Sequence, residues 1–527
     1  MSGRLPAALA AAVVLGFLGL FFAWPVAAII GLGLGGAGPV LAEAATWRLV
    51  GFTLGQAAAS TAVALLAGMP LAYVLARLAI PGRGLLRVVV TVPFVLPTIV
   101  VGMAFRALFG AEAGVSAIVL ANAFFNVAVV ARTVSGLWGH LDRRAEDAAR
   151  SLGASRWRAF TSVTLPALLP ALGSAAAVVF LFSATSFGVV LVLGGGALRT
   201  LETEIYLRTV QLLDLSGAAA LSLLQLAAVL AALLVATAAR RRRETALRLR
   251  APVDTARRPQ GGERIIVGFA LLVVAALLTP IATLLVRSVS TRDGWGLDGY
   301  RALLGTGEPG TLEVTGLEAA LNSLRTAADA TWMALLLGLL ASFVLVTTRR
   351  RFFAEGLDLA LMLPLGVSAV TVGFGYLITL GSLPGDLRTS PLLVPFAQAL
   401  VVTPLVIRTV LPVLRAIDDR LRQAAATLGA GPWRVRREID VPLVLRTVLA
   451  AAGFGFVVAL GEFGATSFLA RPDAPTLPVA IGRLLGRPGE LNSQLAYAAC
   501  ALLMIVTVLG VVLIERLRVR ADAVEDF

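Results

Sequence analysis

The side chains that most often do chemistry are scarce in this sequence of 527 residues. Its single cysteine, Cys500, allows neither a disulfide framework nor a thiolate metal site. Its single histidine, His140, cannot build a multi-histidine metal site or a convincing serine triad, and suits a helix end at a membrane surface. The sequence contains no lysine, which a phosphate-binding P-loop requires. We therefore expect no enzyme, no metal site and no nucleotide or other cofactor bound by this chain.

A short motif occurs twice with the same internal spacing. Each copy has a polar residue, two alanines, a glycine six positions after the polar residue, Trp-Arg, and an aliphatic-x-aliphatic-Pro end. The copies are Asp147, Ala148, Ala149, Gly153, Trp157, Arg158 and Pro166, and Gln423, Ala424, Ala425, Gly429, Trp433, Arg434 and Pro442. All pairs are 276 positions apart, as are Phe187 and Phe463. The chain is therefore interpreted as two homologous halves.

Composition indicates that these motifs belong to a membrane protein. Hydrophobic residues make up 58% of the chain, charged residues 14%, and the mean hydropathy is +0.88. A water-soluble core cannot bury that much apolar surface. The 45 basic residues, all arginine, outnumber 31 acidic ones. They cluster between apolar segments and form no aromatic-studded basic domain, which excludes nucleic acid as a partner.

Twelve apolar segments are long enough to cross the ~30 Å hydrocarbon core of a bilayer. They must be helices, because unpaired backbone groups are too costly in lipid. We predict an all-α membrane protein of about twelve transmembrane helices in two homologous six-helix halves. The predicted domains are a first half at 1–239, a cytoplasmic linker at 240–263 and a second half at 264–527. The spans centre on 7–35, 50–76, 88–108, 115–137, 166–193, 215–239, 264–287, 320–347, 355–381, 391–413, 443–469 and 493–515.

Arginine clusters follow the even-numbered spans, which predicts that both termini and both motif copies lie in the cytoplasm. The first apolar run continues to about Leu34, too long for the 7–15-residue apolar region of a signal peptide. We therefore expect a retained first span, with a cleaved signal peptide as the alternative. The weak points of the span assignment are the glycine-rich stretch 31–37 and the polar break Gly381–Ser390.

Each motif copy predicts a short alanine-rich amphipathic helix, a glycine turn and a Trp-Arg pair suited to anchoring in a groove of another protein. The alternative is an ordinary interfacial helix whose Trp and Arg lie at the level of the lipid headgroups. Two copies in register on one side of the membrane favour docking, since lipid contact does not fix the distance from glycine to proline.

The repeated motif resembles the cytoplasmic EAA loop of bacterial ABC-importer permeases, and the resemblance covers nearly the whole chain. It implies the type I ABC-importer permease architecture in the bacterial cytoplasmic (inner) membrane. It also implies two partners: an ABC ATPase subunit, as a homodimer that carries the ATP and Mg, and an extracytoplasmic substrate-binding protein. The second copy departs from the family pattern at Gln423 and Pro432.

In that family the motif forms coupling helices that dock on the ATPase, which places the coupling loops here at about 141–166 and 417–442. The resemblance assigns ATPase docking to Glu146, Asp147, Ala148, Ala149, Gly153, Trp157 and Arg158, and to Gln423, Ala424, Ala425, Gly429, Trp433 and Arg434.

The fused halves are similar to those of thiamine and iron(III) importers. Several stretches resemble the thiamine-permease pattern: Phe124–Asn126 with Arg132, Ser186–Gly196, Thr200–Glu202, Ile205–Tyr206, Asp214 and Ala218–Gln225. The predicted cargo is therefore thiamine or its phosphates. Iron(III) stays the alternative, because iron permeases share the EAA loops and the Phe-Gly element and a fold does not fix its substrate.

Acidic residues inside apolar spans are costly, and they usually face a cavity or a partner. Glu462 and Asp329 are the two candidates, and either of them can instead be a satisfied structural group. The resemblance adds residues near the ends of the spans, some of them in the extracytoplasmic stretch where a binding protein would touch. The predicted pathway or binding-protein residues are Ser186, Phe187, Glu202, Tyr206, Asp214, Asp329, Glu462 and Phe463.

Two other classes of protein are alternatives to a permease driven by a separate ATPase. A secondary transporter would run on an ion gradient and would show coupling residues in place of paired docking loops. A membrane enzyme would need a convergent catalytic cluster, which the sequence does not offer.

Overall fold

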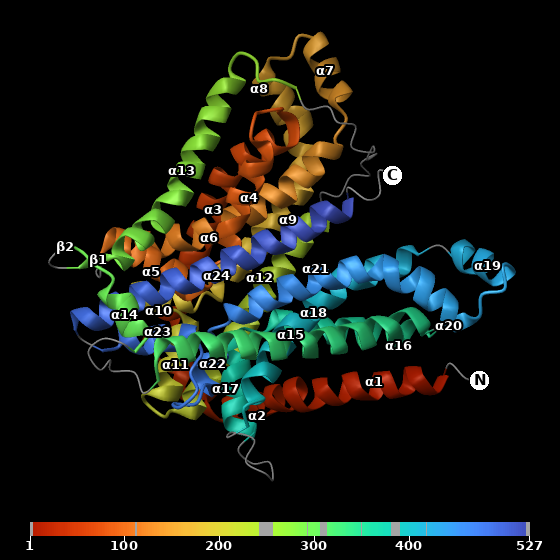
Figure 1. Cartoon of the computed structure of the whole chain (residues 1–527). Coiled ribbons are helices and arrows are strands. Elements are labelled where there is room, and N and C mark those ends of the chain that lie inside the picture. The colour runs from red at the N-terminus through yellow and green to blue at the C-terminus, as the bar shows by residue number, and fades with distance from the viewer. Residues whose placement is uncertain are drawn as a thin grey trace. The chain divides into compact units, whose positions relative to one another are not determined.

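Figure 1 shows a computed structural model of the chain, coloured from red at the N-terminus to blue at the C-terminus. Most of the predicted linker and most of the predicted break Gly381–Ser390 lie outside the described residues. The described residues are 4–110, 113–241, 257–291, 294–305, 314–348, 350–380, 390–417, 419–487 and 489–522.

The helices gather into two compact units, each of which combines segments from distant parts of the sequence. We call Pro39–Glu204 with Leu224–Arg287 the N unit, and Met1–Gly38 with Ile205–Leu223 and Ser288–Phe527 the C unit. The first segment of the chain therefore folds with the second half of the sequence. The boundaries of these folded units differ from those of the two predicted sequence halves, which stay a prediction.

The N unit is built around three long helices, α3, α6 and α9, which pack against one another. The bounds of its elements are α3 (Ala44–Arg77), α4 (Arg83–Val95), α5 (Thr98–Phe109), α6 (Gly114–His140), α7 (Arg143–Ser151), α8 (Arg156–Ala159), the π-helical turn η2 (Phe160–Thr164), α9 (Leu165–Ala184), α10 (Gly188–Leu193) and α13 (Glu263–Ser288). Close approach needs small residues here, because a Cβ on Gly68 would lie 2.6 Å from Val130 of α6.

The C unit repeats this arrangement with α15, α18 and α21. Its elements are α1 (Arg4–Leu18), the π-helical turn η1 (Gly19–Ala23), α2 (Trp24–Ala42, which ends in the N unit), β1 (Ser290–Thr291), β2 (Gly294–Trp295), α14 (Asp298–Leu303), α15 (Gly316–Thr347), α16 (Arg351–Gly366), α17 (Ala369–Thr379), α18 (Leu393–Ala416), α19 (Asp419–Thr427), α20 (Pro432–Val435), the π-helical turn η5 (Arg436–Asp440), α21 (Val441–Leu460), α22 (Thr466–Leu469), α23 (Leu477–Leu485) and α24 (Glu490–Asp522). Strands β1 and β2 form a small antiparallel hairpin. Helices α11 (Leu201–Val210) and α12 (Leu215–Arg241) are divided between the units.

The sequence repeat is also a repeat of structure. Elements α19, α20, η5 and α21 each begin and end 276 positions after α7, α8, η2 and α9. The offset is smaller earlier in the chain, since α15 ends only 270 positions after α3. It rises to 276 because the loop between α17 and α18 is longer than the loop between α5 and α6. A tertiary hydrogen bond repeats as well. Leu201 N–H donates to Thr53 Oγ1 at 3.1 Å, and Leu477 N–H donates to Ser323 Oγ at 2.6 Å.

Ten helices in the described part of the chain are long and apolar enough to cross a membrane, or twelve spans if two bent helix pairs count as one each. The pairs are α4 with α5, bent by 101°, and α16 with α17, bent by 97°. The twelve segments expected from hydropathy coincide with these spans. The fold-class prediction is therefore confirmed.

The two bends have different local causes. Pro97 forces the preceding Leu96 into extended backbone, with ψ of 137°, so that α4 ends at Val95. In the other pair, Ser368 caps α17 by accepting a hydrogen bond from Thr371 N–H at 3.1 Å. Both halves thus break a span at the same place by separate chemistry.

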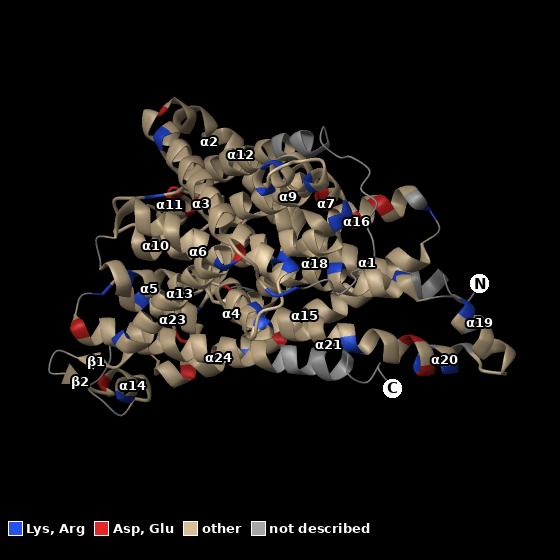
Figure 2. Cartoon of the chain, turned by 90° about the horizontal axis from the view of Figure 1, so that it is seen from above, with Lys and Arg blue, Asp and Glu red and all other residues tan. Residues whose placement is uncertain are grey.

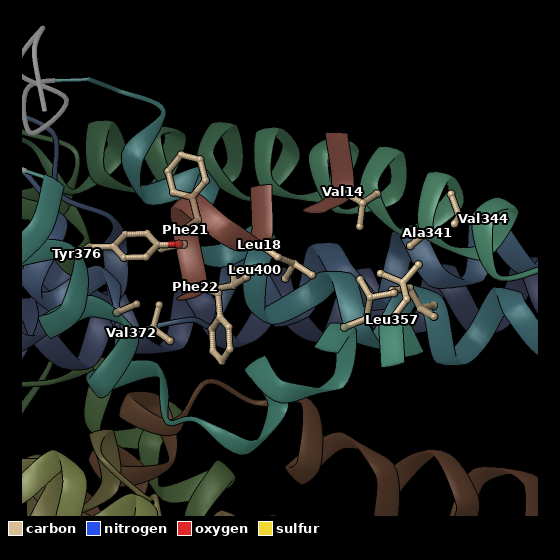
Figure 3. Packing of buried hydrophobic residues seen from close by; sticks show 14 of the residues in the cluster. Val14, Leu18, Phe21, Phe22, Ala341, Val344, Leu357, Val372, Tyr376 and Leu400 are labelled. Atoms are coloured by element: carbon tan, nitrogen blue, oxygen red, sulfur yellow. The ribbon is translucent and has the colours of Figure 1, made fainter. Parts of the chain in front are cut away.

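The first apolar segment contributes to the core of the C unit. Val14, Leu18 and Phe21 pack with side chains of α15 to α18 in the cluster of Figure 3. The Phe21 ring lies 5.9 Å from that of Tyr376 and 4.7 Å from that of Phe396, measured between centroids. Aromatic pairs at such distances stabilise beyond the area that they bury.

The glycine-rich stretch that weakened the span assignment is helical throughout, within α2. A Cβ on Gly33 would lie 2.8 Å from Ala219 O, and one on Gly36 would lie 2.7 Å from Ser216 O. These glycines therefore permit close packing against the start of α12. Their small size serves a helix crossing, and it marks no break in the helix.

Candidate docking loops

The first motif copy forms a short helix with a defined start and end. Asp142 caps α7, its Oδ1 accepting a hydrogen bond from Arg144 N–H at 3.0 Å. The helix ends because Gly153 takes a φ of +90°, which a glycine adopts at little cost. Ser155 then caps α8, its Oγ accepting from Arg158 N–H at 3.2 Å.

The end of α7 is closed by three backbone hydrogen bonds. Leu152, Gly153 and Ala154 donate their N–H groups to the carbonyls of Ala148, Arg150 and Ala149 at 3.0, 3.0 and 3.1 Å. Bonds of this kind satisfy the carbonyls that a helix leaves unpaired at its C-terminus.

The second copy ends in the same way. Leu428, Gly429 and Ala430 donate to Ala424, Ala426 and Ala425 at 3.2, 3.0 and 3.0 Å, and Gly429 has a φ of +83°. All three bonds join positions 276 residues after those of the first copy. The predicted glycine turns therefore share one backbone geometry.

In both copies, a π-helical turn joins the loop to the next long helix. Turn η2 leads into α9 and η5 leads into α21. Such turns are rare and are often found at functional sites. The helical backbone consequently runs without interruption from α8 into α9 and from α20 into α21.

The surface of each loop carries a large exposed leucine just before the glycine. Leu152 is 89% exposed and Leu428 is 88% exposed. Trp157 of α8 is 73% exposed, and the side chain of Trp433 lies outside the described residues. Isolated exposed leucines need no explanation, but here the two copies expose a leucine at the same position and to the same extent.

The remaining predicted docking residues line these helices. Asp147 and Gln423 are exposed, as are Ala148 and Ala424, whereas Ala149 and Ala425 are half-buried. Figure 2 marks charged positions on α7 and around α19 and α20, among those of the other helices. The structure thus brings the predicted docking residues of each copy onto one short segment.

The base of the first loop is held by aromatic rings and a hydrogen bond. The buried Trp138 ring lies 5.2 Å from Tyr73 and 6.1 Å from Phe160, and Trp157 lies 5.8 Å from Phe160. Thr164 Oγ1 donates to Glu146 Oε2 at 3.3 Å. Glu146, predicted to dock, therefore also ties α7 to the turn η2.

The end of the predicted linker attaches beside this base. Glu263 accepts hydrogen bonds from Tyr73 Oη at 2.8 Å, Arg257 Nη1 at 3.0 Å and Gln260 N–H at 2.9 Å. Arg257 also pairs by its backbone, since its carbonyl accepts from Ala79 N–H at 2.9 Å. The sequence analysis missed this cluster, and its only signal was an acidic residue at the start of an apolar span.

The base of the second loop differs. Arg434 Nε donates to Glu438 Oε1 at 2.9 Å, and both side chains are more than half exposed. The positions that correspond to Trp138 and Phe160 are occupied by Leu414 and Arg436, which carry no aromatic ring. Among the side chains that the structure describes, the two loops therefore share a backbone but differ in the contacts that anchor them.

The predicted pathway residue Glu462 lies where the helical path after α21 breaks. Its Oε1 accepts from Ala465 N–H at 2.8 Å, and its Oε2 accepts from Thr466 N–H at 3.0 Å and from the Thr466 hydroxyl. The side chain is 8% exposed. The carboxylate therefore caps α22, which is the structural alternative left open by the sequence. Its neighbour Phe463 and the matching Ser186 and Phe187 are buried as well.

Asp329 lies on α15 and is half-buried. Its Oδ1 accepts from Trp332 Nε1 at 3.3 Å, and the Trp332 side chain is 52% exposed. The carboxylate of Asp329 therefore has a hydrogen-bond partner on its own helix.

The three predicted residues of α11 and its following turn differ in exposure. Glu202 is fully buried in the N unit and accepts a hydrogen bond from Gln225. In the C unit, the rings of Tyr206 and Phe468 meet edge to face, with their centroids 5.3 Å apart. Burial raises the pKa of the Tyr206 hydroxyl, and the charge of Arg483 opposes this effect. Asp214 is 39% exposed and pairs with Arg208 at 3.2 Å. The side chain of Asp214 is therefore partly accessible, whereas that of Glu202 is not.

Two clusters in the N unit were missed by sequence reasoning. One is a buried polar network in which Gln56 Nε2 donates to Ser183 O at 2.7 Å, and Asn122 Nδ2 donates to Gln56 Oε1 at 3.0 Å. The other consists of the three phenylalanines Phe94, Phe125 and Phe182. Polar residues within apolar spans were the available signal for the first, but only the fold brings the three rings together.

Within the described part of the chain, no group of three or more His, Cys, Asp or Glu side chains gathers to hold a metal ion. The features that do stand out are the apolar spans, the repeated bends and the two matched loops. They define a multi-pass transport permease built from two copies of one half.

The chain belongs to the family of binding-protein-dependent transport system inner membrane components, whose model matches residues 64–244 and 334–520. This confirms the predicted recognition, the permease function and the location in an inner membrane. The chain is 26% identical over 469 residues to the thiamine transport system permease protein ThiP of Brucella abortus (strain 2308), covering 84% of this chain and 82% of that protein.

Other relatives extend the comparison. The ThiP protein of Escherichia coli (strain K12) is 26% identical over 491 residues, which cover 87% of this chain and 88% of that protein. The sulfate transport system permease protein CysT of the same strain is 35% identical over 181 residues, covering 31% of this chain and 65% of that protein. Relatives that match across most of the chain are thus fused proteins of similar length.

Proposed function

We propose that this permease is driven by a separate ATP-hydrolysing subunit, which docks as a homodimer on the two loops around Gly153 and Gly429. The observation that carries the proposal is the repeated geometry of the loops: three matched backbone hydrogen bonds, a matched left-handed glycine and a matched exposed leucine. A homodimer presents the same groove twice, so that two equal surfaces on one chain suit it.

The loops are suited to transmit movement. A partner that displaces α7 would also move η2 and α9, since Glu146 is bonded to Thr164 and the helical backbone is continuous. Packed helices move as units because their cores are not continuously deformable. The helices α9 and α21 both lead to broken stretches, at 185–187 and 461–465. We infer that partner movement at the loops acts on the pathway near these breaks.

The proposed topology has the loops and both termini in the cytoplasm and a substrate-binding protein on the opposite side. Arginine placement supports this orientation. The exposed Asp214 is the proposed contact for the binding protein on the C unit.

The proposed cargo is thiamine or its phosphates. Support comes from the two fused relatives with thiamine in their names, which match at 84% and 87% of this chain. Iron(III) is not in the names of these relatives and stays an untested alternative.

The test is uptake of labelled thiamine into proteoliposomes that contain the full chain with its ATPase subunit and binding protein. We expect uptake against the gradient that requires ATP and both partners. Uptake that runs on an ion gradient without the ATPase would overturn the mechanism. ATP-driven uptake of ferric iron without thiamine would overturn the cargo alone.

A further inference from the structure

We propose that Phe94, Phe125 and Phe182 of the N unit, called here the aromatic cluster, contact an aromatic cation as it crosses the permease. The inference rests on the proposed function, and it names the residues that would recognise the cargo. The cluster is assembled from three different helices: α4, α6 and α9.

The three rings contact one another in pairs. The centroid of Phe94 lies 5.2 Å from that of Phe125 and 6.3 Å from that of Phe182, and the last two are 6.4 Å apart. Their planes are inclined by 35°, 42° and 74°, so that no two rings lie face to face in parallel. The cluster is not sealed inside the unit, because Phe182 is 40% exposed and the other two are half-buried. Ring surface is therefore available to a further flat group.

The cluster lies beside two interruptions of helical backbone. Phe94 is two residues before Leu96, where the first bent pair turns by 101°. Phe182 is two residues before the end of α9 at Ala184. Irregular backbone at membrane depth is tolerated only inside protein or along a water-filled cavity, and discontinuous helices commonly form the substrate sites of transporters. The rings therefore lie next to two helix breaks of the kind that forms substrate sites in transporters.

The second half lacks this cluster in its sequence. The positions that correspond through the helix repeat are Leu365, Val401 and Val458, all aliphatic. Packing alone is satisfied by aliphatic side chains at these places, since the surrounding helices and bends are repeated. The rings of the N unit therefore supply something that leucine and valine do not, namely flat faces with negative electrostatic potential.

Those faces select for a recognisable chemistry. Thiamine joins a positively charged thiazolium ring to an aromatic pyrimidine, so one part suits cation–π attraction and the other suits stacking. Phenylalanine offers both without a fixed charge. The contact is thus weak enough for the cargo to leave again, as conduction through a pathway requires.

The test uses the full chain with its ATPase and binding protein in proteoliposomes. The triple variant Phe94→Leu, Phe125→Leu, Phe182→Leu keeps the apolar character and removes the rings. We expect its uptake at limiting thiamine to fall about ten-fold, as the loss of a desolvated cation–π contact implies. The matched control is Leu365→Ile, Val401→Leu, Val458→Leu, which should transport at the wild-type rate. Co-purification with the ATPase subunit shows that each variant is folded.

A second measurement separates ring chemistry from shape. Phe182→Trp should preserve uptake, because indole is the best partner for a cation. Replacing Phe182 with phenylalanines of rising fluorine content should lower uptake stepwise, since fluorine withdraws charge from the ring face. A leucine triple that transports like the wild type would overturn the inference and leave the proposed function standing. A wild-type chain that imports no thiamine would overturn the cargo and the inference together.

Discussion

The two docking loops have the same backbone, but the contacts that hold the base of each loop, called here its foundation, differ. Around Gly153 and Gly429 the hydrogen bonds agree bond for bond, and the exposed leucines agree in position and exposure. Beneath the first loop lie the stacked Trp138 and a linker cluster on Glu263, whereas the second loop has the exposed pair of Arg434 and Glu438. What is repeated is therefore the outer surface together with its backbone.

This difference separates two demands on the chain. The proposed partner, with two equal grooves, would require the same contact surface twice, which accounts for the recurrence of the turn, the glycine and the leucine. The attachment of each loop to its own unit can be met by any stable packing. Variants of the shared surface, of the foundations and of the exposed ion pair test this difference, in order of decreasing expected effect.

The largest effect is expected from the shared surface. The double variant Leu152→Asp, Leu428→Asp places a charge in each proposed contact, and burying an unpaired charge at an interface is strongly unfavourable. We expect ATP-driven thiamine uptake in proteoliposomes to fall by more than about a hundred-fold. The control is the double variant Leu152→Met, Leu428→Met, which should retain uptake. Wild-type uptake in the aspartate variant would show that the leucines are not contacts.

The foundations should differ in how much they stabilise. Trp138 is 4% exposed, and Trp138→Ala should destabilise the purified chain by about 3 kcal/mol because it leaves a cavity. The matched Leu414→Ala acts on a half-buried side chain and should cost about 1 kcal/mol. Thermal unfolding in detergent, followed by the exposure of Cys500 to a thiol reagent, measures both. Equal shifts in the two variants would contradict the contrast between the foundations.

The glycines should behave alike. Gly153→Ala and Gly429→Ala meet no atom within 4 Å, so their cost is only that of a left-handed backbone, about 1 kcal/mol each. The melting temperatures of the two variants should agree within error. A clear difference would mean that the two turns are not equivalent.

The smallest effect is expected at the ion pair of the second loop. Arg434 and Glu438 are 69% and 56% exposed at the side chain, and Glu438→Gln should change stability by less than about 0.5 kcal/mol. Thr164→Val, which removes the hydrogen bond to Glu146 in the first loop, should cost about 1 kcal/mol. The same melting assay ranks them, and the reverse order would contradict the assignment.

Sequence reasoning succeeded where the signal is local or periodic. The spans follow from apolar length, and the turns follow from glycine placed after a short polar helix. It could not tell that the first span folds into the C unit, because hydropathy does not name the partner of a helix. Nor did it establish that Glu462 caps α22, although the donors lie only three and four residues further along the chain. The burial of Glu202 depends on the fold, which brings Gln225 beside it. The aromatic cluster joins positions up to 88 residues apart, beyond any local pattern.

The central claim is that both loops bind the same kind of ATP-hydrolysing subunit. It is tested most directly by placing a photo-crosslinking residue at Leu152, at Leu428 and, as a control, at Trp295, which is 75% exposed on the β1–β2 hairpin. The account predicts that the first two positions trap the ATPase subunit in the assembled transporter and that the third does not. ATP-driven transport in an assembly where neither loop position crosslinks to the ATPase would contradict it.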